Sequence, residues 1–429
     1  MRLFGKIALV LLVPQLALAQ WTEAQEGQLV IRGGWLFDGV SDERRPNTGI
    51  LIQDGRVEEV IDNGIIFLAN GVTSTWSAGE YYPERVIAQR DRVDAGESVG
   101  PRLFASGPYF GAFRCEYNIG TAADECIGWP NDITEDEIRQ EVDAWAEQGV
   151  VSLKIKQASP GEMKIIIEQA HEHGMTTAAH LANYDWVYDV DLRDAILMGL
   201  DRVEHQLTLG SGGAESAELP QMIDLMLAHG VYYDANLQMY GGINERRAHA
   251  EEMLWTDEAK YFTPYAQGLL EERGEPAPES EEPEFTQRVF ELKSLYDAGG
   301  AHLLLVGTDE PVYTNLLPGF AYHRELLAMT YADIPPASVL KAATINGARA
   351  LGVVDRLCSI EPGKLADIFI VRGNPLDDIK VARDISLVIK DGVVYDSAEL
   401  LQSAEGKIGP AGPDDHADWD LEIRPLRGE

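Results

Sequence analysis

The sequence predicts an α/β protein: a (β/α)8 TIM-like barrel whose first strand has no clean counterpart, with a small β-sandwich formed by both chain ends. From about residue 100, short strand-like segments alternate with amphipathic segments of helical length, which predicts βαβ units around a parallel sheet. The 429 residues accommodate such a barrel and an accessory domain. A doubly wound open sheet is the alternative. Because no G-x-G-x-x-G motif opens a helix after a strand, dinucleotide binding is not predicted.

Capping and stop residues mark the helix boundaries in this alternating region. The segment Thr134–Glu137 has the spacing of a capping box, and Gly149 ends the helix that follows. Ser159-Pro160 opens the next helix, which ends at Gly174. Further helices are predicted over 186–198, 220–229 and 285–298. Strands are predicted around Val72 and over 101–106, 150–156, 175–180, 200–205, 231–237 and 302–306.

The two ends of the chain differ from this region. Residues 29–60 and 365–396 contain short apolar runs separated by Asp-Gly turns, which favour β-hairpins. We therefore expect a β-sandwich built from residues 20–60 and 356–429, with a loose tail from Gly409 onward. The barrel is expected over 61–355.

The N-terminal segment, 1–19, has the features of a secretory signal peptide. Two basic residues precede an apolar run, 7–13, that is shorter than the roughly 20 residues needed to span a bilayer. A small-x-small cleavage pattern follows at 17–19. We expect a secreted or periplasmic protein with no membrane attachment after cleavage. In that setting Cys115 and Cys126 form either a disulfide or two unpaired thiols.

Charge excludes one class of partner. The chain has 35 Lys and Arg against 71 Asp and Glu, a net charge of −36, and would repel phosphate backbones, so nucleic-acid binding is not expected. Residues 271–284 are acidic and rich in proline, and we interpret them as a solvated loop or lid. The sequence leaves homo-oligomerisation open.

Four polar residues stand in or after predicted strands. Lys154 lies within one strand, and His180 and His205 end the next two. Asp309 follows the last strand. Because barrel active sites collect at the carboxyl ends of the strands, we expect these side chains to converge, and two imidazoles with a carboxylate suit a divalent metal such as zinc. Lys156, on the same strand face, is the alternative to Lys154.

With these residues in place, the sequence resembles the metal-dependent amidohydrolase superfamily over essentially the whole chain after the signal peptide. It looks closest to the exported imidazolonepropionase-like and Xaa-Pro dipeptidase-like members. The two most specific segments are LKAATINGARALG (340–352) and SIEPGKLADIFIV (359–371). The shorter motifs are ANGVTST (69–75), GPRLFASGP (100–108), GVVSLK (149–154), AAH (178–180), DRVEH (201–205) and GTD (307–309).

The resemblance implies a role for each residue. Lys154 would be carbamylated and bridge two metal ions, with His180 and His205 binding the second ion. Asp309 would bind the first ion and act as general base towards metal-activated water. The implied reaction is hydrolysis of the C–N bond of a non-standard or cyclic amide or a dipeptide-like small molecule. His323 is a candidate substrate-binding residue, with a helix-surface position as the alternative.

One feature of the family pattern is absent. Family members carry an H-x-H pair at the end of the first barrel strand, and no such pair precedes Ala69. His171 and His173 have that spacing but fall in the last turn of a predicted helix. The chain passes from 56–60 almost directly to 61–71, which resembles the family's first barrel helix. Either a segment is missing from this sequence at that junction, or the chain is a variant with one metal ion or none. In the second case a non-catalytic ligand-binding barrel is the alternative function.

Overall fold

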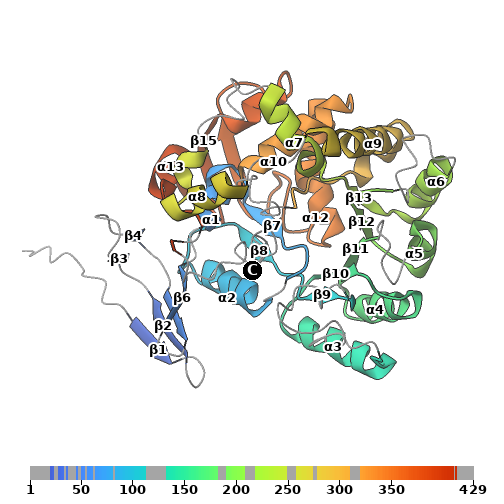
Figure 1. The fold of residues 1–429 in the computed structure, drawn as a ribbon, viewed down its shortest axis with the longest axis horizontal. Coiled ribbons are helices and arrows are strands. Elements are labelled where there is room, and N and C mark those ends of the chain that lie inside the picture. Colours follow the sequence, from blue (N-terminus) through green and yellow to red (C-terminus); the bar gives the residue numbers. More distant parts are fainter. Residues whose placement is uncertain are drawn as a thin grey trace, which may run out of the picture. The chain divides into compact units, whose positions relative to one another are not determined.

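The chain forms two compact units, Met1–Ile61 and Asp62–Glu429 (Figure 1). The predicted signal peptide, Cys115 and Cys126, and residues 413–429 of the predicted tail lie outside the described residues. The computed structural model describes residues 20–23, 28–32, 35–36, 45–46, 50–53, 56–60, 63–80, 83–112, 132–181, 190–207, 218–248, 258–273, 278–309, 319–409 and 411–412.

The first unit contains an antiparallel sheet in the order β1-β2-β5-β6. Strands β5 and β6 pair from Gln53 and Arg56 outward, which confirms the hairpin predicted from the Asp-Gly dipeptide between them. A register shift between Leu51 and Ile52 marks an irregularity in this pair. The strands are β1 (Gln20–Glu23), β2 (Gln28–Arg32), β5 (Ile50–Gln53) and β6 (Arg56–Val60), with a separate pair of β3 (Trp35–Leu36) and β4 (Arg45–Pro46).

The second unit contains the predicted parallel strands side by side. Strands β10 to β13 pair in chain order, and β9 joins the other side of β10. Strand β7 pairs with β8, and the 102–110 stretch, which contains both β8 and β9, connects the two parallel sheets. A parallel bridge between Tyr233 and Leu304 adds the last position. The strands are β7 (Ser74–Trp76), β8 (Arg102–Phe104), β9 (Tyr109–Phe110), β10 (Ser152–Lys156), β11 (Thr176–His180), β12 (Arg202–Glu204) and β13 (Tyr232–Asp234).

The parallel sheet is curved. The guanidinium of Arg202 on β12 lies 3.9 Å from the centroid of the Trp76 ring on β7, although β8/β9, β10 and β11 lie between these two strands. Only a strongly curved sheet lets side chains of such distant strands touch, as they do inside a barrel. Within the part of the chain that the structure describes, no strand joins β7 to the segment at Leu304, so closure into eight strands stays a prediction. Within the segment 61–71, which resembles the family's first barrel helix, residues Asn63–Ala69 form a helix, α1.

Helices follow the strands, and two of them begin as predicted (Figure 1). Thr134 forms a complete capping box with Glu137. Ser159 does the same with Glu162 at the next helix. No helix among the described residues is long and apolar enough to cross a membrane. The helices are α2 (Pro83–Asp94), α3 (Glu135–Glu147), α4 (Pro160–Glu172), α5 (Leu192–Met198), α6 (Leu219–His229), α7 (Leu237–Ala248), α8 (Pro264–Arg273), α9 (Pro278–Asp297), α10 (Phe320–Tyr331), α11 (Pro336–Lys341) and α12 (Gly347–Ala350).

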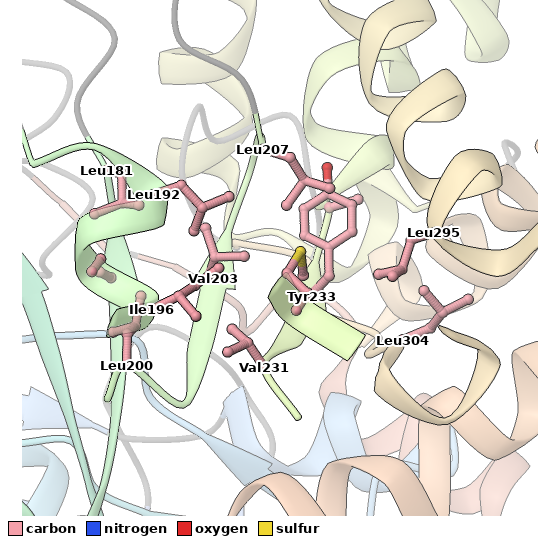
Figure 2. Packing of buried hydrophobic residues seen from close by; sticks show 14 of the residues in the cluster. Leu181, Leu192, Ile196, Leu200, Val203, Leu207, Val231, Tyr233, Leu295 and Leu304 are labelled. Atoms are coloured by element: carbon pink, nitrogen blue, oxygen red, sulfur yellow. The ribbon is translucent and has the colours of Figure 1, made fainter. Parts of the chain in front are cut away.

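The main hydrophobic core lies between these helices and one face of the sheet. Figure 2 shows Val203 of β12 beside Ile196 of α5 in this core. On β10, Leu153 and Ile155 are both fully buried in the same core. Because successive side chains on a strand point to opposite faces, Lys154 between them faces the inside of the curve. The apolar core therefore determines which polar side chains point inward.

The predicted strand over 302–306 is mostly absent, and the prediction was wrong there. Residues Gly300–Leu303 form a 3₁₀ helix, η3, and Leu304 contributes a single bridge. The side-chain amide of Asn346 donates hydrogen bonds to the carbonyl oxygens of Ala301 and Leu304, at 3.0 and 2.9 Å. These two hydrogen bonds tie the 3₁₀ helix and the Leu304 carbonyl to Asn346.

The acidic segment 271–284 is helical where it is described, which corrects its interpretation as a loop. Helix α8 ends within it and α9 begins within it, while residues 274–277 lie outside the described residues. Pro278 takes the first position of α9, where a missing N–H costs no intrahelical hydrogen bond. A high content of proline and acidic residues therefore did not exclude a helix.

The C-terminal region forms an antiparallel sheet in the order β14-β15-β16. Asp391 and Gly392, with φ values of 51° and 77°, connect β15 to β16 and confirm the hairpin predicted at this Asp-Gly dipeptide. Leu68 of α1 packs against Ile385 and Val388 of this sheet. Stacking of this sheet on the N-terminal one stays a prediction. The elements are β14 (Ile368–Val371), η5 (Ile379–Arg383), β15 (Ile385–Lys390), β16 (Val393–Asp396) and α13 (Ser397–Ala404).

A surface ion pair gives the second unit a pH-dependent contribution to stability. Nε2 of His171, in the last turn of α4, lies 2.9 Å from Oδ2 of Asp201, and this hydrogen bond raises the pKa of His171. The stabilisation is therefore full below the ordinary histidine pKa of about 6.5 and is lost as the pH rises through the raised value. Because the His171 side chain is 41% exposed, we expect it to contribute no more than about 1 kcal/mol.

Urea unfolding of the wild type and of His171→Gln, at about pH 5.5 and about pH 8.5, measures this contribution. At about pH 5.5 the wild type is expected to have a larger free energy of unfolding than His171→Gln. At about pH 8.5 this difference between the two proteins should be smaller. His229→Gln, at the exposed end of α6, controls for loss of an imidazole. A difference between wild type and His171→Gln that is the same at both pH values contradicts the assignment.

Candidate active site

The register of the parallel strands places the predicted residues at neighbouring strand ends. Lys156 pairs with His180 across β10 and β11, and Lys154 pairs with Ala178. His205 follows β12 directly. The carboxyl ends of three adjacent strands therefore carry these side chains to one edge of the sheet.

The two histidines and Asp309 meet at this edge. The ring centroids of His180 and His205 are 4.1 Å apart, with planes inclined at 45°. Nε2 of His205 lies 3.8 Å from Oδ2 of Asp309. The His205 side chain is 3% exposed and that of Asp309 is 26% exposed, so the group opens to solvent on the Asp309 side. Residues from widely separated parts of the sequence thus lie together at this edge.

Lys154 lies inside the curve of the sheet, with 3% of its surface exposed. Its ammonium contacts Oε2 of Glu204 on β12. Lys156, the alternative, is partly exposed, and its ammonium lies 5.9 Å from the centroid of the Tyr109 ring. Because Lys154 is buried and contacts β12, the strand that precedes His205, it is a better candidate for the site than Lys156.

Burial determines the protonation of the cluster. It lowers the pKa values of His180 and His205 well below the usual histidine range, and the lysines nearby add to the effect. Both imidazoles are therefore neutral at neutral pH, each with one ring nitrogen able to act as a ligand. Burial also lowers the pKa of Lys154 to about 7, against the opposing attraction of Asp309. A substantial fraction of this lysine is then a neutral amine near pH 7.

Two of the site residues have left-handed backbone conformations. The φ of His205 is 73° and that of Asp309 is 50°. Aspartate tolerates this region comparatively well, whereas a histidine there is strained and needs support from its surroundings. The His205 N–H donates to the Asp234 carbonyl at 2.7 Å, and the His205 carbonyl accepts from the Tyr233 hydroxyl at 3.0 Å. Strand β13 thus holds His205 from both sides of its peptide.

Sequence reasoning missed Glu204, the partner of Lys154. Glu204 is 3% exposed, and its Oε1 lies 3.4 Å from Nε of Arg202. The signal was present: Arg202 and Glu204 alternate with the buried Val203, so both charged side chains share the face opposite the apolar core. A charged pair at a spacing of two in a short buried strand indicates a polar interior.

Asp234, at the carboxyl end of β13, was also missed. Burial raises its pKa to about 6, partly offset by Arg202 and Lys154. Its Oδ1 is buried and makes no hydrogen bond within the described residues. A β-carbon added at Gly307 would collide with this carboxylate, so the Gly307–Asp309 segment passes directly against it. Glycine at position 307 is what allows Asp309 to approach the cluster.

Helix α7 brings a third missed residue, Tyr240, to the site. Its hydroxyl lies 3.3 Å from Nδ1 of His205. When Nδ1–H donates to this oxygen, the lone pair of Nε2 faces Asp309. The start of α7 is capped by the buried carboxylate of Glu325, which accepts from the N–H groups of Leu237 and Gln238 at 3.0 and 2.7 Å. Burial raises the pKa of Glu325 to about 8.

His323, the candidate substrate-binding residue, is buried in α10 with 3% of its surface exposed. Its Nε2 lies 3.0 Å from the carbonyl oxygen of Asn70, which follows α1. Burial lowers its pKa to about 3, so the imidazole is neutral and Nε2–H donates to Asn70. Burial rules out the helix-surface alternative, while a role in substrate binding stays a prediction. His171 and His173 lie on the surface, paired with Asp201 and Asp143 respectively.

The donor set agrees in chemistry with a divalent metal site. Two neutral imidazoles and a carboxylate are ligands that zinc takes in catalytic sites. Within the described part of the chain, however, no three His, Cys, Asp or Glu side chains are close enough together to hold an ion. His180, His205 and Asp309 thus have the donor atoms of zinc ligands, but the described residues do not form a complete ligand set.

A family model described as "Amidohydrolase family" matches residues 30–395. The chain belongs to the amidohydrolase family. This confirms the family that the sequence resembles.

Two curated relatives match parts of this amidohydrolase. A 5-methylthioadenosine/S-adenosylhomocysteine deaminase of Teredinibacter turnerae is 38% identical over 90 residues, which cover 20% of each chain. An imidazolonepropionase of Picrophilus torridus is 48% identical over 54 residues, 13% of each chain. The chain thus spans a fifth or less of the length of these relatives.

A solved structure resembles the chain over much more of its length. The crystal structure of a Xaa-Pro dipeptidase with bound methionine superimposes with a TM-score of 0.57, covering 86% of this chain and 99% of the other at 20% identity. At that identity the likeness concerns the fold, and it supports a TIM-barrel-like α/β architecture.

Gly307→Ala tests the close approach of the Asp309 segment to β13. The added methyl meets the Asp234 carboxylate, so we expect a loss of roughly 1–3 kcal/mol in the free energy of unfolding. Gly347→Ala in α12 is the control, because a β-carbon there meets nothing within 4 Å and alanine favours a helix. Denaturant unfolding of the three proteins gives the comparison. A Gly307→Ala variant as stable as the wild type contradicts the packing argument.

Proposed function

We propose that the chain is an exported, metal-dependent amidohydrolase that hydrolyses the C–N bond of a small non-standard or cyclic amide, or of a dipeptide-like molecule. The observation that carries the proposal is the cluster of His180 and His205 at adjoining strand ends with Asp309 beside them, and Lys154 on the next strand. Four side chains that suit one metal-assisted hydrolysis thus come together from β10, from β11, from the turn after β12 and from the segment that follows Leu304.

The relatives support the substrate class. One relative is named imidazolonepropionase, and one similar structure is a Xaa-Pro dipeptidase. The substrates that these names indicate are small molecules with an amide-type C–N bond. The strongly acidic composition fits a small-molecule substrate better than a polyanionic one.

Each residue of the cluster has a separate task in this mechanism. His180 and His205 would hold a divalent ion through neutral ring nitrogens, with carbamylated Lys154 as a further ligand. When bound, such an ion polarises the scissile carbonyl and lowers the pKa of a water ligand to near 7. Asp309 would accept the proton of that water at a carboxylate oxygen and deliver it to the leaving nitrogen. Its partial exposure lets substrate reach it from the solvent side.

A non-catalytic ligand-binding barrel is the second candidate. It is favoured by the absence of an H-x-H pair before Ala69 and by the pairing of Lys154 with Glu204, which uses the lysine as an ammonium rather than as a ligand. Metal content separates the two candidates. Elemental analysis of the purified chain should find about one to two zinc ions per chain. A metal-free chain that gains neither metal nor activity with added zinc and bicarbonate would falsify the enzymatic proposal.

Asp309→Asn tests the general-base assignment. Loss of the proton acceptor should lower kcat by about 10²- to 10⁴-fold on any amide that the wild type hydrolyses, in a panel of Xaa-Pro dipeptides and cyclic amides. Asp333→Asn is the matched control, because Asp333 is exposed and also has a positive φ, of 53°. Turnover by Asp309→Asn equal to that of the control would show that another group accepts the proton.

Export can be tested by N-terminal sequencing of the chain from the periplasm or the medium. The mature protein should begin at Gln20, after the small-x-small pattern at 17–19. Retention in the cytoplasm with the first 19 residues intact would contradict the proposed localisation.

A further inference from the structure

The strained backbone of His205 has a support that the amidohydrolase mechanism does not require by itself. A histidine at φ 73° lies in a strained conformation that persists only where its surroundings impose it. Its carbonyl accepts from the Tyr233 hydroxyl at 3.0 Å. The same hydroxyl lies 3.3 Å from Oε2 of Glu291 on α9.

Glu291 also holds the segment that follows His205. Its Oε2 accepts from the N–H of Leu207 at 2.9 Å, and its Oε1 accepts from the Gln287 side chain at 3.1 Å. One carboxylate therefore contacts the chain after His205 directly, and it lies beside the Tyr233 hydroxyl, whose single proton is shared between Oε2 of Glu291 and the His205 carbonyl. Figure 2 shows Tyr233 and Leu207 next to each other.

This arrangement buries the carboxylate of Glu291. Glu291 is 1% exposed, and Tyr233 is fully buried in the hydrophobic core that also contains Leu292 and Leu295 of α9. A carboxylate in such a place loses its hydration and is tolerated only when its oxygens are hydrogen-bonded. Packing of α9 alone would be served better by an apolar side chain. The charge is placed where it accepts from the turn that carries His205.

We propose that Glu291 and the Tyr233 hydroxyl are positioning residues, which hold His205 in its left-handed conformation so that Nε2 is directed at Asp309. The inference rests on the proposed function for its purpose, since a fixed Nε2 matters for metal binding, but the positioning itself is a property of the metal-free chain. Neither residue touches substrate or metal in this scheme.

Tyr233→Phe is the decisive variant, because it removes one hydroxyl and leaves the ring in the core. Tyr232→Phe, on the opposite face of β13, is the matched control. Glu291→Gln is the conservative partner: its amide oxygen can still accept from Leu207, so it should retain part of the effect. Unfolding midpoints of all variants are recorded alongside the measurements.

The first readout needs neither metal nor activity. In metal-free protein labelled with ¹⁵N-histidine, the ring signal of His205, assigned by its loss in His205→Gln, should shift in Tyr233→Phe and remain in place in Tyr232→Phe. Hydrogen exchange of the His205 amide should become about fivefold faster in Tyr233→Phe, the equivalent of one lost hydrogen bond. Unchanged His205 signals and exchange, or equal shifts of all histidines, would overturn the proposal.

The second readout is zinc affinity by competition with a chelator. We expect Tyr233→Phe to bind zinc about 10- to 100-fold more weakly than Tyr232→Phe, with Glu291→Gln between them. Equal zinc affinity in Tyr233→Phe and its control would also overturn the proposal. If the wild type binds no zinc, the proposed function fails, and the metal-free measurements still decide whether Glu291 and Tyr233 position His205.

Discussion

The parallel register of β9 to β13 is the constraint on which the candidate active site depends. Each strand places its carboxyl end beside that of the next, so a polar residue at one strand end becomes the neighbour of a polar residue far away in sequence. His180 and His205 are 25 positions apart in the chain, yet their rings are 4.1 Å apart. Curvature of the sheet brings a second pair of distant residues, Arg202 and Trp76, into contact. Without that register the same residues would be isolated side chains.

On the inside of the curved sheet, ionisable side chains of β10 and β12 lie against one another. Lys154 contacts Glu204, Glu204 lies against Arg202, and Arg202 stacks on Trp76, so the interior is crossed by one connected series from β10 through β12 to β7. Buried charges of this kind are tolerated when each has a partner, and removal of one partner leaves the other uncompensated. The same pairing keeps Lys154 close to the histidines, where carbamylation would make it a ligand.

Local patterns predicted local structure well. The capping boxes at Thr134 and Ser159, the Asp-Gly hairpins and the inner strands were all identified, because each depends on hydrogen bonds or side-chain alternation within a few residues. Where a strand was predicted over 302–306, the chain forms a 3₁₀ helix as far as Leu303, and Asn346, from a later helix, donates to the carbonyl oxygens of Ala301 and Leu304. The loop predicted over the acidic segment was wrong where α9 begins. Composition indicates how well a segment is solvated, but it does not indicate how the apolar residues that follow it pack.

The sequence by itself determined the amidohydrolase family, the alternation of strands and helices, and the residue types at the strand ends, since these are encoded in local periodicity and short motifs. The tertiary structure alone decided the partners: Glu204 for Lys154, Tyr240 and Tyr233 for His205, and Gly307 as the point where Asp309 passes Asp234. These contacts join elements whose separation depends on the curvature of the sheet and the placement of α7 and α9. No local pattern carries that information, because it arises from the packing of the whole unit.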